Sequence, residues 1–272
     1  MRIAIQGELA SNSEAAALEH FGAGAEALPC ETFEQAFDAV ESGQAQAGML
    51  PIENSLAGSI HRNYDLLLQH KLWIIGEHYL RVQHCLIAHP GVALADIRRV
   101  ISHPQALAQC DHYLRALPGV TTGVVYDTAG SVKMIKEQGD RSVAAIASRR
   151  AAEFYGMHIL AEGIEDDPAN FTRFLALACE PATGSSDAKT SIVFATRNVP
   201  GALFKAMSAF ALRDIDLTKI ESRPLVGKPW EYLFYIDLAG STQDATVKRA
   251  LDNLGEFSSL LRVLGSYPRH RP

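Results

Sequence analysis

The order of strand-like and helix-like segments predicts an α/β protein with two domains. From residue 1 to about 178, short apolar strands alternate with helical segments, a rhythm typical of βαβ units in largely parallel sheets. A small, polar segment at 180–187 follows and reads as a linker. The remaining residues show the order βαββαβ, which is the ferredoxin-like arrangement. We therefore expect one domain over residues 1–180 and a second over residues 188–272.

The first domain is expected to begin with a strand at 3–5 and a helix from Ser13 to Phe21, with Ser13 as its candidate N-cap. The next expected elements are a helix at 33–41, a buried strand at 47–51, a helix at 64–68 and a strand at 72–75. Strands at 100–101, 123–125 and 143–146 each precede a helical run. Chemistry in such folds collects where strands end and helices begin.

The second domain is expected to contain four strands and two helices. The strands are placed at 190–195, 217–222, 232–238 and 260–264, and the helices at 201–212 and 245–254. A lone βαββαβ unit leaves a sheet face or edge uncovered. We therefore expect another surface to cover this face or edge.

Composition and charge exclude several classes of protein. The 272 residues are 47% hydrophobic, and the formal net charge of −6 argues against a nucleic-acid partner. No apolar stretch reaches the ~20 residues that cross a bilayer, so we expect no membrane association. Met1 and Arg2 lead directly into the first strand, which predicts no signal or transit peptide and a cytoplasmic location.

The spacing of cysteine, histidine and glycine residues argues against several kinds of site. The four cysteines, at 30, 85, 110 and 179, show no Cys-x-x-Cys spacing, and the ten histidines form no His-Glu-x-x-His motif. We therefore expect no metal and no cofactor. There is also no Gly-x-Ser-x-Gly, Gly-x-Gly-x-x-Gly or phosphate-loop signature, which disfavours serine hydrolysis, hydride transfer and nucleotide hydrolysis.

The triplet Thr172-Arg173-Phe174 is the most informative local feature. It places a hydroxyl, a guanidinium and an aromatic ring together, just after the acidic residues Asp166 and Asp167. A hydroxyl donor beside a fixed cation suits a substrate that carries carboxylates and must lose hydroxide. Taken alone, such a pair at a strand start is usually a solvated edge.

Four more polar clusters stand at βα junctions of the first domain. They are Gln6-Gly7-Glu8, Pro51-Ile52-Glu53-Asn54-Ser55, Ser102-His103-Pro104-Gln105 and Asp127-Thr128-Ala129-Gly130-Ser131. Each alone is compatible with an ordinary helix cap or turn. Together with the Thr172 triplet they favour a shared polar cleft in which helix N-termini meet an anion.

These motifs identify a resemblance over nearly the whole chain. The first domain resembles the prephenate dehydratases in the four clusters from residue 51 onward, which include the Thr172 triplet and of which the second extends to Ala106-Leu107. The second domain resembles the ACT domain, through Gly201-Ala202-Leu203-Phe204 and Glu221-Ser222-Arg223-Pro224. The resemblance implies a two-lobed, periplasmic-binding-protein-like catalytic domain with a cleft between its lobes. With no chorismate mutase module ahead of it, we expect a monofunctional enzyme.

Two departures from the family pattern stand out. Members commonly read Tyr-Gln-Gly-Glu-Pro-Gly-Ala-Tyr-Ser near the start, whereas this chain reads Ile-Gln-Gly-Glu-Leu-Ala-Ser-Asn-Ser at 5–13. A glycine and an aromatic residue are thus replaced by Ala10 and Asn12. Gly163 stands where many bacterial members have Asn, and the runs at 161–164 and 60–65 look more like the plant-type branch that favours arogenate.

The resemblance implies conversion of prephenate to phenylpyruvate, carbon dioxide and water, with the arogenate reaction as the alternative. Thr172 is the expected donor to the leaving hydroxyl, with His103 as the alternative acid or a simple helix cap. Arg173 is expected to hold a carboxylate or to pair with Asp166 or Asp167, and Phe174 to pack in the core. The expected orienting donors are Asn54, Ser55, Ser102, Gln105 and Thr128.

The resemblance also implies that L-phenylalanine is an allosteric effector bound by the C-terminal module. The residues expected around it are Asn198, Gly201, Ala202, Leu203, Phe204, Glu221, Ser222, Arg223 and Pro224. A homodimer or homotetramer is the expected assembly. A second alternative is a non-catalytic, amino-acid-sensing protein, because two-lobed α/β domains also serve as receptors.

Overall fold

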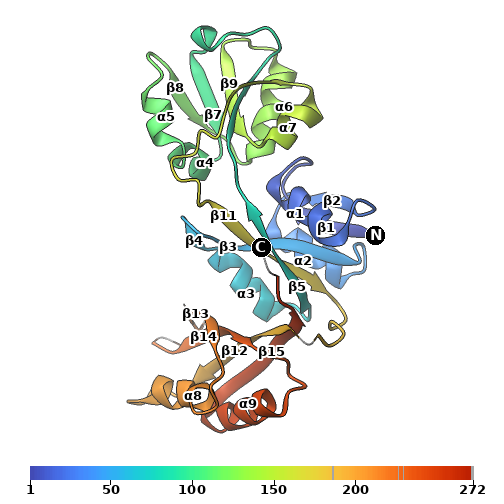
Figure 1. Ribbon diagram of the computed structural model, residues 1–272, viewed down its shortest axis with the longest axis vertical. Coiled ribbons are helices and arrows are strands. Elements are labelled where there is room, and N and C mark those ends of the chain that lie inside the picture. Colours follow the sequence, from blue (N-terminus) through green and yellow to red (C-terminus); the bar gives the residue numbers. More distant parts are fainter. Residues whose placement is uncertain (186, 226, 229, 271–272) are drawn as a thin grey trace. The chain divides into compact units, whose positions relative to one another are not determined.

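The computed structural model describes residues 1–185, 187–225, 227–228 and 230–270 of the chain. By its internal contacts the chain divides into two compact units. The first unit comprises Met1–Ile60 and His78–Phe174, and the second comprises His61–Glu77 and Leu175–Pro272. The segment His61–Glu77, which lies inside the expected first domain, therefore packs with the C-terminal part of the chain. Figure 1 shows the elements of both units.

The first sheet has the strand order β2-β1-β3-β11-β5, with β4 paired to β3. Its strands are β1 (Arg2–Gln6), β2 (Glu26–Cys30), β3 (Ala47–Asn54), β4 (Gly58–Ser59), β5 (Trp73–Arg81) and β11 (Phe171–Ala178). Strand β1 runs parallel to β2 and β3, with α1 (Asn12–Phe21) and α2 (Phe33–Glu41) as the connecting helices. The N-cap of α1 is Ser11, whose hydroxyl accepts from Glu14 N, and Ser13 already lies within the helix.

The second sheet has the order β10-β6-β9-β7-β8 and is mixed. Its strands are β6 (Cys85–Ala88), β7 (Arg99–Ser102), β8 (Thr121–Val124), β9 (Val143–Ala147) and β10 (His158–Glu162). Strands β7, β8 and β9 are parallel, as predicted, whereas β6 pairs antiparallel with β9 and β10. We call residues 1–60 the first lobe and residues 82–165 the second lobe.

Helices cover both faces of the second sheet because strand side chains alternate between faces. The helices are α4 (Pro104–Ala108), α5 (Asp111–Arg115), α6 (Thr128–Gln138) and α7 (Arg149–Tyr155), with the short 3-10 helix η1 (Leu94–Asp96) before β7. Ile87 and Ala145 pack with residues of α6 and α7, whereas their neighbours Leu86 and Ala144 pack with Ala106 of α4. Figure 1 shows α5 and the pair α6–α7 on opposite sides of this sheet.

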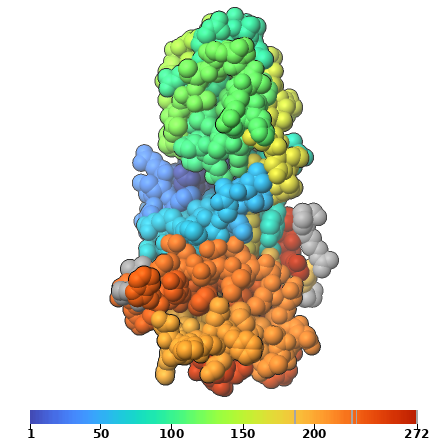
Figure 2. All heavy atoms as spheres, turned by 90° about the vertical axis from the view of Figure 1, so that its left-hand side faces the viewer, coloured from blue at the N-terminus to red at the C-terminus, as the bar shows by residue number. Residues whose placement is uncertain are grey.

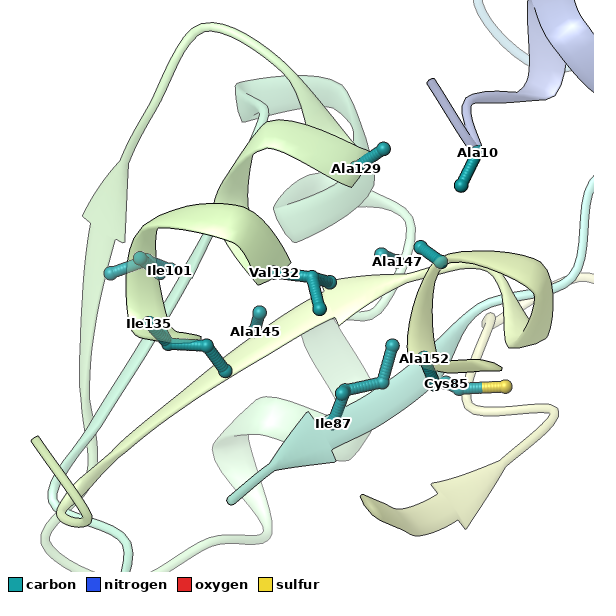
Figure 3. Close-up of a cluster of buried hydrophobic side chains, with 11 residues drawn as sticks. Ala10, Cys85, Ile87, Ile101, Ala129, Val132, Ile135, Ala145, Ala147 and Ala152 are labelled. Atoms are coloured by element: carbon teal, nitrogen blue, oxygen red, sulfur yellow. The ribbon is translucent and has the colours of Figure 1, made fainter. Parts of the chain in front are cut away.

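Ala10 of the first lobe inserts into the core of the second lobe. It is fully buried and belongs to the cluster around Ala129, Val132 and Ala147 (Figure 3). Its φ of 63° lies in the left-handed region that favours glycine. The cost of that conformation is offset by the apolar contact of the methyl group with the second lobe.

The second unit contains the predicted βαββαβ module, which is confirmed. Its elements are β12 (Ala188–Thr196), α8 (Ala202–Ala211), β13 (Leu217–Pro224), β14 (Tyr232–Ala239), α9 (Ala245–Phe257) and β15 (Ser258–Pro268). The antiparallel sheet has the order β13-β14-β12-β15. Residues of α8 and α9 cover one face, where Phe194, Phe210 and Leu254 are fully buried. Helix α3 (His61–Gln69) belongs to the same unit.

None of the helices in the described part of the chain is long and apolar enough to cross a membrane.

Candidate active site

Residues of both lobes line a cleft of about 430 Å³ in the first unit. Figure 2 shows a recess where the green surface of the second lobe meets the blue surface of the first. Most of the lining side chains are polar and uncharged. Among the residues that line the cleft are Gln6, Ser11, Asn12, Ser13, Asn54, Ser59, Ile60, His84, His103, Gln105, Gln109, Tyr126, Asp127, Thr128, Thr172 and Phe174.

The cleft is built to receive anions without a cation on its wall. No lysine or arginine is among the described residues that line it. Instead, the first residues of two helices face it: Ser11 to Ser13 at the start of α1, and Asp127 and Thr128 at the start of α6. Free backbone N–H groups and the helix dipole favour negative charge at such positions.

The triplet at the start of β11 is divided between the two faces of its strand. Thr172 and Phe174 line the cleft, whereas Arg173 is not among the lining residues. Side chains i and i+2 of a strand share a face, and the residue between them points to the other. Arg173 is buried with its guanidinium 6.0 Å from the centre of the Tyr79 ring. The structure therefore does not bring the guanidinium and the hydroxyl to the same side of the strand.

Asn54, at the end of β3, fixes the direction in which the Thr172 hydroxyl donates. Its Oδ1 accepts from the backbone N–H groups of Leu56 and Ala57 at 3.1 and 3.0 Å. Because backbone N–H groups only donate, the opposite atom, Nδ2, must face Thr172. Its two hydrogens are shared among Thr172 Oγ1 at 3.1 Å, Phe171 O at 3.1 Å and Asn170 Oδ1 at 2.8 Å. With this lone pair occupied, the hydroxyl hydrogen of Thr172 is left for another acceptor in the cleft.

Two further amides and a histidine extend this network. Asn54 Nδ2 donates to Asn170 Oδ1 at 2.8 Å, and Asn170 Nδ2 donates to Gln109 Oε1 at 3.1 Å. Gln109 Nε2 closes the ring on Asn54 Oδ1 at 3.3 Å. His84 Nε2 lies 3.0 Å from Gln109 Oε1, which can only accept, so Nε2 carries the hydrogen.

Gln109 and His84 are cleft residues that the sequence motifs did not identify. Gln109 had a usable signal, because it lies four residues after Gln105 and thus on the same face of a helix. His84 lies in the short link between β5 and β6 and carried no local pattern. Only the pairing of strands from distant parts of the chain brings it to the cleft.

Two of the predicted substrate contacts hold the backbone instead. Ser55 donates to Ala169 O at 2.7 Å and accepts from Phe171 N at 2.9 Å. Ser102 is fully buried and donates to Ile146 O at 2.6 Å. Neither residue is among those that line the cleft. By contrast, Asn54, His103, Gln105 and Thr128 all line it. Ser11 and Asn12, from the run at 5–13 that differs from the family pattern, line it as well.

The two lobes also meet through ion pairs and hydrogen bonds at the edge of the cleft. Tyr126 donates to Glu8 at 2.7 Å, and Lys133 Nζ lies 3.3 Å from the same carboxylate. Arg150 of α7 donates to Glu14 of α1 at 3.0 Å. Burial, followed by the contact with Glu8, raises the pKa of Tyr126. This phenol therefore stays protonated and acts as a donor across the lobes at neutral pH.

Two titratable groups of the cleft, His103 and Asp127, serve as helix N-caps. Burial lowers the pKa of His103, whose Nδ1 accepts from Gln105 N at 3.2 Å as the N-cap of α4. Burial raises the pKa of Asp127, although its hydrogen bond from Gly130 N opposes the shift. No group of three or more potential metal ligands is present among the described residues.

The second unit carries a smaller cavity of about 230 Å³ at the start of α8. Of the residues expected around an effector, Asn198, Gly201, Ala202, Leu203 and Phe204 line it. The structure does not place Glu221, Ser222, Arg223 or Pro224 among the residues of this cavity. The remaining wall includes Trp230, Tyr232 and Phe234, which the sequence motifs did not identify. We call this space the effector cavity.

The lowered pKa of His84 predicts a loss of stability at mildly acidic pH. Burial disfavours the charged imidazole more than its contacts with Gln109 and Glu165 favour it. The folded protein therefore binds a proton less readily than the unfolded chain, whose histidines titrate near pH 6.5. Stability is fully present above that pH and falls as the pH drops toward the folded-state pKa.

His84→Gln keeps an N–H donor for Gln109 but cannot titrate. We expect its melting temperature to fall less between pH 7 and pH 5.5 than that of the wild type, as measured by circular dichroism. His158→Gln, a change at an exposed histidine of β10, is the control. Equal losses in the wild type and in both variants would contradict the assignment of the proton uptake to His84.

Comparison with known proteins shows the family of the chain that carries these two cavities. The sequence matches the family described as "Prephenate dehydratase" over residues 3–182 and the "ACT domain" over residues 190–256. It is 51% identical over 279 residues to arogenate dehydratase/prephenate dehydratase 2 of Arabidopsis thaliana, a chloroplastic protein, covering 98% of this chain and 73% of that protein. It is 49% identical to arogenate dehydratase 2 of Petunia hybrida, covering 98% of this chain and 72% of that protein.

Solved structures agree with this assignment. Prephenate dehydratase from Arthrobacter aurescens, solved in complex with L-Phe, is 34% identical with a TM-score of 0.91, covering 99% of this chain and 90% of that chain. GqqA, described as a novel type of quorum quenching acylase, is 39% identical with a TM-score of 0.91, covering 99% and 98% of the two chains. The expected two-lobed α/β architecture with a C-terminal ACT domain is confirmed. The chain belongs to the prephenate dehydratase family.

Proposed function

We propose that the protein converts prephenate to phenylpyruvate, carbon dioxide and water, and that phenylalanine inhibits it. The observation that carries the catalytic proposal is the Thr172 hydroxyl, oriented by Asn54 at 3.1 Å in the polar cleft. A hydroxyl whose lone pair is occupied in this way presents its hydrogen to a leaving oxygen. This is the group that loss of hydroxide from a ring requires.

The reaction breaks two bonds of the substrate ring. The electron pair of the bond to the ring carboxylate moves into the ring as carbon dioxide departs, and the bond to the para hydroxyl breaks. The departing hydroxide takes up a proton and leaves as water. Because threonine is a weak acid, Thr172 acts as a hydrogen-bond donor whose donation is concerted with bond breaking in a preorganised cleft.

The start of α6 is already capped by the Asp127 carboxylate, which accepts from Gly130 N. The start of α1, whose N-cap is the uncharged Ser11, is left to favour the substrate carboxylates. The uncharged side chains of Asn12, Gln105 and Thr128 add donors around them. Phe174 provides an apolar surface beside the ring.

The charges of the cleft favour prephenate over arogenate, which carries an ammonium group in place of the keto oxygen. Among the described lining residues the only carboxylate is that of Asp127. Its Oδ1 accepts from Gly130 N at 2.6 Å, and burial raises its pKa. One oxygen of this carboxylate is thereby engaged as the N-cap of α6. The arogenate reaction remains the second candidate because relatives 49–52% identical to this chain bear the name arogenate dehydratase.

The two substrates can be compared directly with the purified protein. We expect kcat/KM for prephenate, followed by phenylpyruvate absorbance, to exceed that for arogenate, followed by release of phenylalanine. A higher kcat/KM for arogenate would reverse the substrate assignment. Absence of turnover with both substrates would favour a non-catalytic sensing protein.

Removal of the Thr172 hydroxyl tests its role as donor. Thr172→Val keeps the branched shape, and we expect kcat to fall by roughly 10²-fold or more, the usual scale for a positioned acid. Thr172→Ser restores the hydroxyl and should retain much more activity. His103→Ala is the comparison: a larger loss there would assign proton donation to His103.

The effector cavity is suited to a free amino acid with an apolar side chain. Helix α8 begins at its edge with no side-chain cap at Gly201, and a helix N-terminus favours a carboxylate. Leu203, Phe204, Trp230 and Phe234 surround the remaining space with apolar surface. The ACT domain match and the L-Phe complex of the Arthrobacter aurescens relative support phenylalanine as the ligand.

Gly201 is the position at which this ligand site can be altered with least effect elsewhere. Its φ of 78° is strained for any other residue, by roughly 1–2 kcal/mol, and the valine of Gly201→Val would also intrude on the cavity. We expect phenylalanine affinity by calorimetry to fall about 10-fold or more, with basal turnover retained. Gly24→Val, at a glycine with open surroundings in the first unit, is the control. Unchanged affinity in Gly201→Val would contradict the location of the site.

A cytoplasmic location and association into at least a dimer through the C-terminal module stay predictions. Strand β13 is an edge strand of its sheet, and its residue Ile220 is half exposed, which leaves a surface for pairing.

A further inference from the structure

We propose that helix α3 is the lever through which phenylalanine in the effector cavity changes the cleft. The lever is held by strand β13, and Arg223 and Asp65 form its main contact. This inference rests on the proposed effector function and adds its route. The motif Glu221-Ser222-Arg223-Pro224 then has two roles, one on each face of its strand.

Successive side chains of strand β13 point alternately to the face of the sheet that carries the effector cavity and to the face that contacts α3. Ser222 pairs with Phe234 across the antiparallel ladder, and Phe234 lines the effector cavity. Directly opposed residues point to the same face, and their neighbours along the strand point to the other. Glu221 and Arg223 therefore point away from the effector face, together with Tyr235, the partner of Glu221.

Both charged residues of the motif bind α3. Arg223 donates to both carboxylate oxygens of Asp65, at 3.3 and 2.9 Å. The two side chains are only 22% and 27% exposed, and Asp65 raises the pKa of Arg223 further. Glu221 Oε1 lies 3.1 Å from His61 Nε2. Bidentate arginine–carboxylate pairs fix orientation as well as distance, so a shift of β13 is transmitted to α3.

The rest of α3 and the strand after it are tied to the same sheet. Tyr235 donates to Tyr64 O at 2.8 Å, and the two rings lie edge to face with their centres 4.9 Å apart. Arg262 of β15 donates to the backbone carbonyls of Leu68, His70 and Leu72 at the end of the helix. These contacts satisfy carbonyl groups that the helix end leaves unpaired.

The following segment is packed even more closely. Lys189 Nζ lies 2.7 Å from Glu77 Oε1, and both side chains are almost fully buried. At Gly265 a Cβ atom would lie 2.1 Å from Ile74 O, so only glycine permits this approach of β15 to β5. The segment His61–Glu77 therefore moves with the ACT module as one body.

Each place where the chain passes between the two units lies within five residues, along the chain, of a residue that lines the cleft. The first crossing follows Ile60, which lines the cleft together with Ser59. The second follows Glu77 in β5, whose continuation reaches the cleft residues Val82 and His84. The third follows Phe174 in β11, two residues after Thr172. The three crossings therefore connect the second unit, through the backbone, to segments that carry cleft residues.

Inhibition requires that phenylalanine bind one position of this lever more tightly than the other. A ligand wedged against Phe234 shifts β14 and its paired strand β13, Arg223 and Glu221 move α3, and Ile60 shifts at the cleft. Removing the Asp65 carboxylate should loosen this transmission while leaving both cavities intact.

The test uses the full-length protein and two readouts. In Asp65→Ala we expect phenylalanine to bind with nearly wild-type affinity in calorimetry and basal turnover to be retained. The factor by which saturating phenylalanine lowers turnover should shrink by about 5-fold or more, since allosteric couplings typically span about 5- to 150-fold. Asp111→Ala, which removes the carboxylate of the surface pair with Arg115, is the matched control and should be inhibited like the wild type.

The outcomes separate this inference from the function on which it rests. If the wild type binds no phenylalanine, the effector proposal itself fails. If Asp65→Ala binds phenylalanine and is inhibited fully, the effector proposal stands and the lever is wrong. If Asp65→Ala loses binding in proportion to inhibition, α3 supports the ligand site and does not transmit from it, which also overturns the lever. Should Asp65→Ala fold poorly, Arg223→Lys keeps the charge, loses the bidentate contact, and should show the same separation of binding from inhibition.

Discussion

The orientation of the Asn54 carboxamide is the constraint on which the cleft depends. Two backbone N–H groups, of Leu56 and Ala57, hold its oxygen, and this leaves its nitrogen to donate to Thr172 and Asn170. The direction of every later hydrogen bond in the ring, through Gln109 to His84, follows from that choice. A turn after β3 thus determines which way a hydroxyl on β11 donates. Chemistry by a weak acid requires such orientation, because a freely rotating hydroxyl would present its lone pairs as often as its hydrogen.

Strand alternation explains why neighbouring motif residues have unrelated roles. On β11, Thr172 and Phe174 face the cleft, and Arg173 is buried on the other side near Tyr79. On β13, Ser222 shares the face of the effector cavity, whereas Arg223 binds Asp65 of α3. In both motifs the arginine serves the side of the sheet away from the small-molecule site. Because successive strand side chains point to opposite faces, Arg173 and Arg223 contact other parts of the protein on the face away from the cavity.

The absence of a cation from the described cleft wall has a consequence for how the substrate is held. In the proposed reaction, helix N-termini and amide donors bind the dianion through fixed dipoles, which impose less desolvation on the empty cleft than a buried, unpaired arginine would. Glu8 and Glu14 hold the two lobes together, and Asp127 is the carboxylate among the described residues that line the cleft. Ala10, buried in the second lobe at a left-handed φ, adds an apolar anchor to the same segment.

The sequence by itself determined the alternation of elements, the ferredoxin-like module, the family and some of the cleft residues, because these follow from local periodicity and from motifs read along the chain. Asn54, Gln105 and Thr128 could be named since each stands at a strand end or helix start. Only the tertiary structure decided that Ser55 and Ser102 bind backbone, that His84 and Gln109 join the cleft, and that α3 packs with the C-terminal module. These outcomes depend on which distant strands pair and on which face each side chain meets, and a hydrogen bond between residues 25 to 114 positions apart leaves no local pattern.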